Sequence, residues 1–193
     1  MTEAARGRPA VFLDRDGVLN DSVVRDGVPR PPHLVAEFRL LPGVVEACAS
    51  LRAAGFALVV VTNQPDIARG TQTREAVDAI NARLAELVEL DEVCVCPHDD
   101  GDNCECRKPR PGMLLDAGNR LSLDMGGSVC VGDRWRDVEA AKRAGVTAVH
   151  VDRGYREEPA VVGADAVVAN LAGAAEWITS RMGPSNDVFG VDV

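Results

Sequence analysis

Short apolar runs and stretches with helical spacing alternate along this chain. The apolar runs predict β-strands, because each ends in polar or turn residues; they cover residues 11–13, 56–61, 92–95, 128–131, 147–151 and, more weakly, 166–168. Apolar positions at a helical period predict helices over residues 44–54, 74–88, 111–121, 138–144 and 171–182. The alternation is typical of an α/β fold with a three-layer, doubly wound parallel sheet, here of about five strands.

The same pattern predicts a single domain. Residues 1–182 contain no internal repeat, low-complexity block or linker, and residues 183–193 have the composition of a loose C-terminal tail. Residues 21–39 are polar, rich in proline and without a clear period, so we expect a long loop there. Loops of this length in a compact domain usually serve a function.

The composition narrows the class of protein. In a chain of 193 residues, 46% hydrophobic and 26% charged residues describe an ordinary globular domain. The formal net charge of -9 argues against a nucleic-acid partner, because proteins that bind the phosphate backbone usually carry a basic stripe. No apolar run approaches membrane-spanning length and the first nine residues lack a signal-peptide segment, so we expect a cytoplasmic monomer without membrane association.

Polar side chains follow three of the predicted strands. They are Asp14 and Asp16 after the first, Thr62 and Asn63 after the second, and Asp133 after the fourth, with Arg107 and Lys108 before the helix at 111. Because the carboxyl ends of parallel strands meet at one edge of a sheet, we expect these groups to form one site. Carboxylates suit Mg²⁺, a hydroxyl suits phosphate oxygens and a lysine suits developing charge, so the set favours phosphoryl transfer.

Each of these residues also has a purely structural interpretation. An Asp-x-Asp-Gly sequence is a common acidic turn, Thr62 could simply end a strand, and Lys108 could be a solvated surface charge. Asp133 could cap the helix that follows it. The order of all these residues along the chain favours a catalytic site over these structural interpretations.

Four segments resemble the motifs of the haloacid-dehalogenase-like phosphohydrolase superfamily: DRDGVLN, VTNQPDIARG, RKPRPGM and VGDRWRD. Within it, the chain is similar to the heptose bisphosphate phosphatases and the related histidinol-phosphate phosphatases. The resemblance implies a Rossmann-like fold and a phosphoric monoester hydrolase that requires Mg²⁺. Superfamily members with a cap insert it after the first or second motif, where this chain has no spare length, so we expect no separate cap domain.

The resemblance also implies roles for the motif residues. Asp14 is the implied nucleophile, which forms an aspartyl phosphate, and Asp16 is the implied general acid and base. Thr62 and Lys108 are implied to hold the phosphoryl group. The implied substrate contacts are Asn63, Gln64 and Arg107; the implied Mg²⁺ ligands are the carboxylates of Asp14 and Asp133 and the backbone carbonyl of Asp16, with Asp137 as a helper.

Cys96, His98, Cys104 and Cys106 form two i, i+2 pairs of metal ligands joined by the turn-rich segment 99–103. Four such ligands in one tight loop match a tetrahedral zinc site, which is structural because it has no open position. The resemblance implies zinc at the same four positions. Strand alternation makes Cys94 a competing ligand, but we expect it in the core with the remaining two cysteines.

The resemblance favours removal of the 7-phosphate of D-glycero-D-manno-heptose 1,7-bisphosphate, with histidinol phosphate or another small sugar phosphate as the alternative. In the heptose enzymes we expect an Asp- and His-containing stretch after the first motif, where this chain has Ser22-Val23-Val24-Arg25. Two interpretations of another class stay open, a phosphorelay receiver and a non-catalytic, zinc-stabilised interaction module. A receiver needs a phosphoacceptor aspartate after the third strand, where this chain has cysteines.

Overall fold

The computed structural model describes residues 7–25, 28–154 and 159–182. The C-terminal tail that we expect over residues 183–193 lies outside this part of the chain. No helix in the described segments combines the length and the hydropathy that crossing a bilayer requires.

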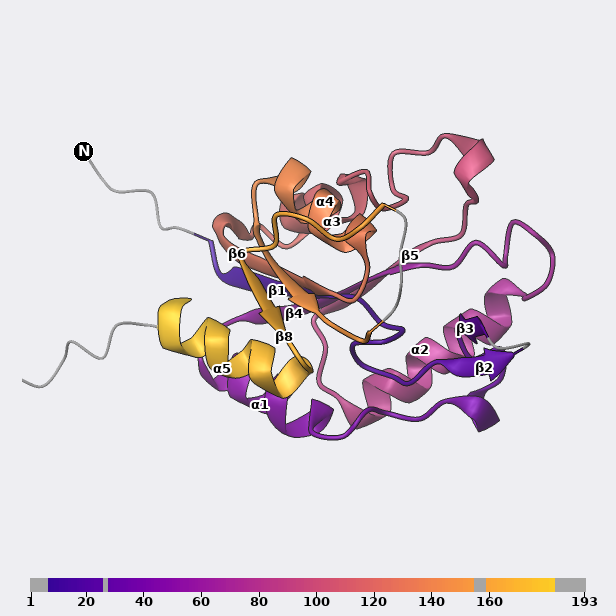
Figure 1. Ribbon diagram of the computed structural model, residues 1–193, viewed down its shortest axis with the longest axis horizontal. Helices are drawn as coiled ribbons and strands as arrows, with labels where there is room; N and C mark the ends of the chain where they lie inside the picture. The colour runs from indigo at the N-terminus through magenta and orange to yellow at the C-terminus, as the bar shows by residue number, and fades with distance from the viewer. Residues whose placement is uncertain (1–6, 26–27, 155–158, 183–193) are drawn as a thin grey trace, which may run out of the picture.

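A six-stranded parallel sheet forms the centre of the fold (Figure 1). Its strands are, in spatial order, β5 (Glu92–Cys96), β4 (Ala57–Asn63), β1 (Pro9–Leu13), β6 (Asp124–Gly132), β7 (Thr147–Val151) and β8 (Ala166–Val168). The doubly wound parallel sheet is as predicted, with six strands rather than about five. The sixth strand is β8, which covers the segment 166–168 where the sequence predicts a weak strand.

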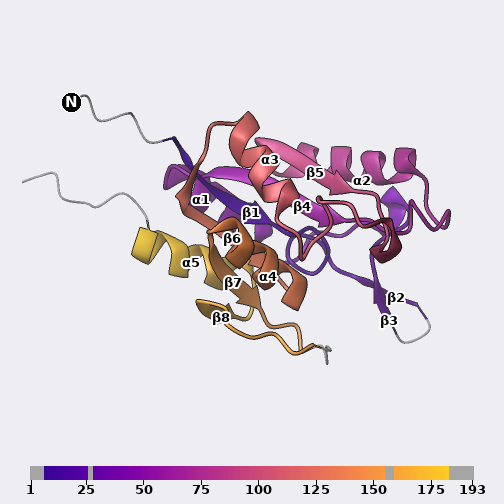
Figure 2. The same ribbon diagram turned by 90° about the horizontal axis from the view of Figure 1, so that it is seen from above.

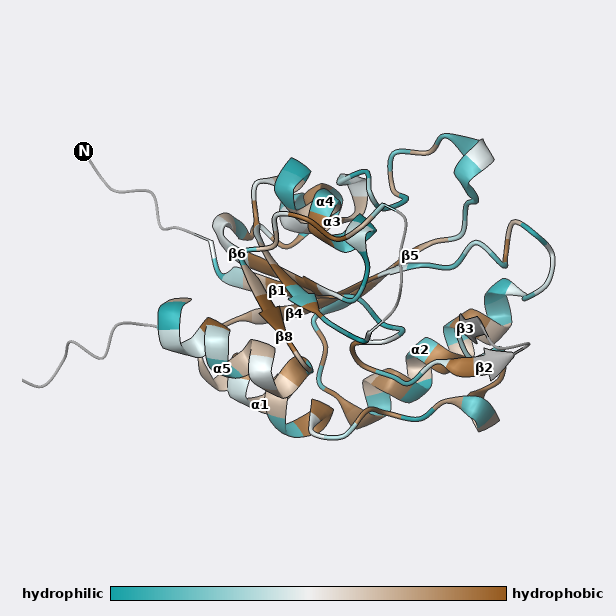
Figure 3. Ribbon diagram, in the orientation of Figure 1, coloured by the Kyte–Doolittle hydropathy of each residue, from teal (hydrophilic) through white to brown (hydrophobic). Residues whose placement is uncertain are grey.

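Helices cover both faces of the sheet and bury two separate apolar cores. One face carries α1 (Val44–Ala53), α2 (Arg74–Leu87) and α5 (Leu171–Met182), and the other carries α3 (Gly112–Arg120) and α4 (Trp135–Ala144). Side-chain alternation along β1 supplies both cores: Val11 and Leu13 face the first set of helices, while Phe12 faces the second. Figure 3 shows the strands as the most hydrophobic part of the molecule and the loops as polar.

The segment 21–39, expected to be a long loop, contains regular structure. β2 (Val23–Arg25) and β3 (Val28–Arg30) form an antiparallel hairpin, and a 3₁₀ turn, η1 (Val35–Glu37), follows it. The hairpin projects beyond the main sheet (Figure 2). Two β-branched residues, Val23 and Val24, favour pairing, but the run is too short to give an alternating pattern in the sequence.

Two predicted boundaries also move. β6 begins at Asp124, four residues before the predicted strand, and α4 begins at Trp135, three residues before the predicted helix. Polar and glycine residues at these ends interrupt the apolar pattern from which the boundaries were predicted.

The connections between the strands are short. Among the described residues, only the hairpin, η1 and α1 lie between β1 and β4, and only α2, β5 and the 3₁₀ turn η2 (Asp100–Asp102) lie between β4 and α3. The described residues between these elements therefore form no separate cap domain, as predicted.

Candidate active site

The end of β1 places Asp14 at the carboxyl edge of the sheet. Leu13 lies beside Val60 of β4 and Val131 of β6, and the Asp14 backbone N–H donates to the Val131 carbonyl at 2.9 Å. Here the chain leaves β1 for β4 on one side and later returns to β6 on the other, the switch point where open α/β sheets bind ligands. Strand alternation sends Asp14 toward α3 and α4, and Arg15 toward α2.

Lys108 joins this edge from the loop before α3. Its Nζ, almost completely buried, donates to Asp14 Oδ1 at 2.9 Å, to the Val61 carbonyl at 2.7 Å and to Asp137 Oδ1 at 2.5 Å. Burial alone would lower the pKa of Lys108, but the carboxylates of Asp137 and Asp14 raise that pKa above its ordinary value. The buried ammonium group is therefore held in its charged form.

The carboxylates of Asp14, Asp133 and Asp137 lie close enough to hold one metal ion, with oxygens within 4.8 Å of one another. Both oxygens of Asp137 are engaged, one by Lys108 and the other by the Arg134 backbone N–H at 3.1 Å. Asp133 Oδ1, in contrast, is buried without a hydrogen-bond partner among the described residues. Asp14 and Asp133 are therefore the better metal ligands.

The surroundings of these two carboxylates also fit a cation. Burial raises the pKa of both Asp14 and Asp133 well above the ordinary range. Repulsion by Asp137 adds to the rise at both groups, and repulsion by Asp14 adds to it at Asp133. Gly17 allows the close approach of Asp133: a Cβ at this position, where φ is 92°, would lie 2.0 Å from Asp133 Oδ2. A divalent cation between the two would remove their mutual repulsion.

Asp16 is held by three side chains. Arg15 Nη2 donates to its Oδ2 at 3.0 Å, Gln64 Nε2 to the same oxygen at 2.8 Å, and Asn20 Nδ2 to its Oδ1 at 2.9 Å. Gln64 Nε2 also donates to Thr62 Oγ1 at 2.9 Å. Since the Thr62 oxygen accepts this hydrogen bond, its own hydrogen can be donated to an oxygen in the cavity.

Asn63 and Arg107 hold other parts of the site in place. The Asn63 amide forms two hydrogen bonds with the backbone of Lys108, donating to its carbonyl at 3.0 Å and accepting from its N–H at 3.1 Å. The Arg107 guanidinium donates to Asp100 Oδ1 at 2.8 Å and to the His98 carbonyl at 3.1 Å. Asn63 thus ties the Lys108 loop to β4, and Arg107 ties it to the loop that carries the cysteines.

The four expected zinc ligands converge. Cys106 Sγ lies 3.3 Å from Cys96 Sγ, 3.4 Å from Cys104 Sγ and 3.3 Å from His98 Nδ1, and Cys96 Sγ lies 3.7 Å from both Cys104 Sγ and His98 Nδ1. A tetrahedron with Zn–S bonds of about 2.3 Å has S···S edges of about 3.8 Å, so the cluster is close to the size that zinc requires. Cys94 lies outside the cluster, in the core, where its sulfur accepts from Arg120.

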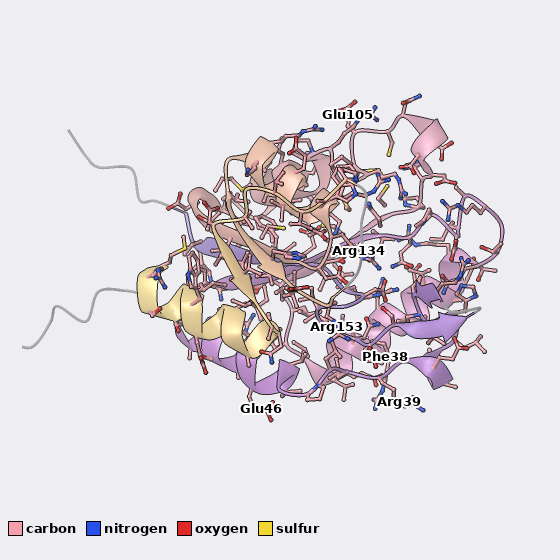
Figure 4. All side chains as sticks on the ribbon, in the orientation of Figure 1. Phe38, Arg39, Glu46, Glu105, Arg134 and Arg153 are labelled. Carbon is pink, nitrogen blue, oxygen red and sulfur yellow. The ribbon has the colours of Figure 1, made fainter. Side chains whose placement is uncertain are left out.

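A cavity of about 470 Å³ opens above the aspartates. Six carboxylates and six cationic side chains line it; the cations are Arg30, Arg69, Arg107, Lys108, Arg134 and Arg136. Figure 4 shows Arg134 at the carboxyl edge of the sheet, below the loop that carries Glu105. The cavity therefore offers charge for an anionic ligand well beyond the cluster around Asp14.

Comparison with known proteins assigns the family. The HAD-hydrolase-like family model matches residues 105–174. A D-glycero-beta-D-manno-heptose-1,7-bisphosphate 7-phosphatase from Yersinia pestis is 41% identical over 187 residues, covering 90% of this chain and 91% of its own. The enzyme of the same name from Escherichia coli K12 is 40% identical over 195 residues, covering 94% and 99% of the two chains.

The chain belongs to the haloacid-dehalogenase-like hydrolases, in the family of heptose bisphosphate phosphatases. A solved structure agrees: the D,D-heptose 1,7-bisphosphate phosphatase of B. bronchiseptica, complexed with magnesium and phosphate, superposes with a TM-score of 0.77 at 33% identity. It covers 89% of this chain and 98% of its own. The family resemblance noted from the four motifs is thus confirmed, and the receiver and interaction-module interpretations do not apply.

Within this hydrolase fold, two expected residues lie differently from what their motif suggests. Gln64, expected to contact substrate, is fully buried behind Asp16 and Thr62 and does not line the cavity. Asn63 reaches the cavity, but its amide is committed to the backbone of Lys108. Both residues position other groups, which the spacing of a strand end cannot reveal.

Sequence reasoning also missed several residues of the site. Asp66, Arg69, Arg134 and Arg136 line the cavity, and His33 Nε2 lies 3.3 Å from Asp66 Oδ2. Asp66 and Arg69 lie within the motif VTNQPDIARG, and Arg134 and Arg136 lie within VGDRWRD. Their place in the motifs was the available signal, but charged residues in loops are usually only solvated.

Proposed function

We propose that this protein is a Mg²⁺-dependent phosphatase that removes the 7-phosphate of D-glycero-D-manno-heptose 1,7-bisphosphate through an aspartyl-phosphate intermediate. The observation that carries the proposal is the identity of about 40% with enzymes of that name, across nearly the whole chain. The arrangement of Asp14, Lys108 and Asp133 at one edge of the sheet supports it.

Asp14 is the proposed nucleophile. Its Oδ1 is bonded to Lys108, so the second oxygen is the one that attacks phosphorus and forms the aspartyl phosphate. The hydrogen of Thr62 and the charge of Lys108 bind the oxygens of the transferred group. Asp16 gives a proton to the leaving sugar oxygen and then takes one from the water that attacks the intermediate.

Magnesium is the proposed cofactor at Asp14, Asp133 and the backbone carbonyl of Asp16. The unpartnered, buried Asp133 oxygen and the raised pKa values of the two carboxylates support a cation at this position. When bound, Mg²⁺ neutralises the repulsion between the nucleophile and the phosphate group. The similar enzyme from B. bronchiseptica was solved with magnesium and phosphate.

Zinc is the proposed structural ion at Cys96, His98, Cys104 and Cys106. The segment between the two ligand pairs, 99–103, is polar and mostly exposed, so burial cannot hold it in shape. Cys106 immediately precedes Arg107 and Lys108, and an ion at the cluster therefore fixes the start of the catalytic loop without taking part in the chemistry.

The heptose bisphosphate carries a second phosphate, which histidinol phosphate lacks. The arginines that line the cavity away from Asp14 support the bisphosphate, since a planar guanidinium binds phosphate through two hydrogen bonds. The expected Asp- and His-containing stretch is replaced by the start of the hairpin, but Asp66 lines the cavity and His33 Nε2 lies 3.3 Å from its Oδ2.

The test is a comparison of kcat/KM for both anomers of the heptose bisphosphate, histidinol phosphate and simple sugar monophosphates. We expect the heptose bisphosphate to be preferred by at least about tenfold. A tenfold preference for histidinol phosphate would reject the proposed substrate but not the phosphatase activity. An Asp14→Asn variant with full activity would reject the proposed mechanism itself.

We further propose a monomer that works in the cytoplasm. None of the six cysteines is paired in a disulfide, which suits a reducing compartment. Size-exclusion chromatography with light scattering tests the first part, because a dimer would elute at twice the mass of 20.5 kDa.

A further inference from the structure

Arg15 is the largest fully buried side chain among the described residues, although it stands between the two aspartates of the first motif. A buried guanidinium is costly unless its charge and its donors are matched. Asp16 matches the charge, with Arg15 Nη2 3.0 Å from Asp16 Oδ2 and Arg15 Nε 3.3 Å from Asp16 Oδ1. The remaining nitrogen, Nη1, donates to Asn81 Oδ1 at 2.8 Å.

Packing alone does not explain an asparagine at position 81. It lies within α2, where the other buried positions are Val77, Ile80 and Leu84, and only 7% of its surface is exposed. An asparagine in a helix interior weakens the helix, and a buried amide packs less well than leucine. The contact with Arg15, which is 66 residues away in the chain, accounts for this amide.

The guanidinium thus bridges a rigid helix and the proposed general acid and base. Asn20 and Gln64 hold the two oxygens of Asp16 from other directions, but each supplies a single hydrogen bond to the carboxylate. The Arg15 fork reaches both oxygens and so fixes the plane of the carboxylate. Asn81 in turn fixes the plane of the Arg15 guanidinium group.

We infer that Arg15, held by Asn81, is a positioning residue that orients the Asp16 carboxylate for proton transfer. This inference rests on the function proposed above, in which Asp16 acts twice. As the ester P–O bond breaks and the Asp14–phosphorus bond forms, the proton of Asp16 goes to the leaving oxygen. As water then attacks phosphorus and the Asp14–phosphorus bond breaks, a proton of that water returns to Asp16.

The test is the Asn81→Leu variant, which removes the acceptor but keeps the branching at Cγ and the number of side-chain heavy atoms. We expect kcat for a sugar phosphate to fall about tenfold, because a general acid–base group contributes about 10² to 10⁴ in rate and here is only misaligned. KM should stay within about twofold, since Asn81 does not reach the cavity. Asn81→Asp keeps an acceptor at the same place and should retain kcat within about threefold.

A second substrate separates positioning from a general loss of structure. With p-nitrophenyl phosphate the leaving group needs little protonation, so Asn81→Leu should still form the aspartyl phosphate quickly and then hydrolyse it slowly. We expect a burst of about one nitrophenolate per enzyme, larger than any burst of the native protein. Arg15→Lys, which keeps the charge but loses the fork, should show the same burst if it folds.

The control is Ile80→Val, which shortens a buried apolar side chain of α2 that has no polar group to bind Arg15. It should lower the melting temperature by a few degrees and leave kcat unchanged. Native kcat in Asn81→Leu, or equal losses in Asn81→Leu and Asn81→Asp, would overturn the inference. If the native protein itself shows no turnover, or turnover that survives Asp14→Asn, the proposed function has failed instead.

Discussion

The molecule contains two clusters of ionisable side chains that are held together in opposite ways. Asp14 and Asp133 lie at the ends of strands with fully buried apolar runs, and Asp137 lies in the first turn of α4, so the sheet and its packed helix hold them in place. The cysteine cluster lies at the end of β5 and in a polar loop, where little apolar surface is buried. The first cluster should therefore keep its geometry without a metal ion, and the second should not.

Lys108 connects the two clusters. Its backbone is two residues from Cys106 and is bonded to Asn63 of β4, while its ammonium group lies among the aspartates. Any disturbance of the cysteine cluster should thus reach the chemistry through Lys108 and its neighbour Arg107. The following predictions test this difference, beginning with the largest effect.

Asp14→Asn should lower turnover by at least about 10⁴-fold, because the amide is not a nucleophile. The fold should survive, with a melting temperature within about 4 °C of the native value, because the sheet and not the carboxylate holds this edge. Stopped-assay turnover and calorimetry measure the two effects. An unfolded Asp14→Asn protein would contradict the idea that the first cluster is prearranged.

Brief chelation should remove Mg²⁺ and abolish activity while zinc stays bound. Adding Mg²⁺ back should restore the rate and raise the melting temperature by about 5–10 °C, since a ligand at 100 times its Kd stabilises by about 2.7 kcal/mol. Zinc content, read by elemental analysis of the same samples, is the control. Activity that persists without Mg²⁺ would rule out the proposed cofactor.

Cys104→Ala should reduce bound zinc from one ion per chain to none. We expect the melting temperature to fall by about 5–10 °C and kcat/KM to fall about tenfold, because Arg107 and Lys108 lose their support. Cys94→Ala is the matched control: it also removes a thiol from this region but lies outside the cluster, so it should keep its zinc. Freshly purified native protein that contains no zinc, yet is fully active, would rule out the proposed zinc site.

Asn63→Ala should produce the smallest effect, about a three- to tenfold loss of kcat/KM. It deletes two hydrogen bonds to the Lys108 backbone, each with a net contribution of about 1 kcal/mol, and leaves both clusters intact. Asn119→Ala, on the exposed side of α3, should match the native protein. Equal kinetics in the two variants would show that the zinc loop alone positions Lys108.

The fold and the centre of the site could be predicted from the sequence because their signals are local. An apolar run that stops at Asp14 indicates a buried strand with a carboxylate at its end, and Gly17 permits the turn that follows. The i, i+2 spacing of Cys96 and His98 brings two ligands together within one short segment. The fold class followed from such features, whereas the family and the lack of a cap domain were expected from the resemblance of four motifs. The fold class and the family are confirmed, and the described residues contain no cap domain.

The residues that the sequence could not place are those that act across the fold. Nothing near Arg15 indicates that its partner is Asn81 on α2, and nothing near Gln64 indicates that it turns behind Asp16 instead of toward a substrate. The hairpin at 23–30 also escaped prediction, because two short strands stabilise one another only once they are paired. Spacing along a chain determines which face of an element a side chain takes. The packing of strands and helices decides which group it meets there, because hydrogen bonds and ion pairs depend on distances of about 3 Å that only the folded chain sets.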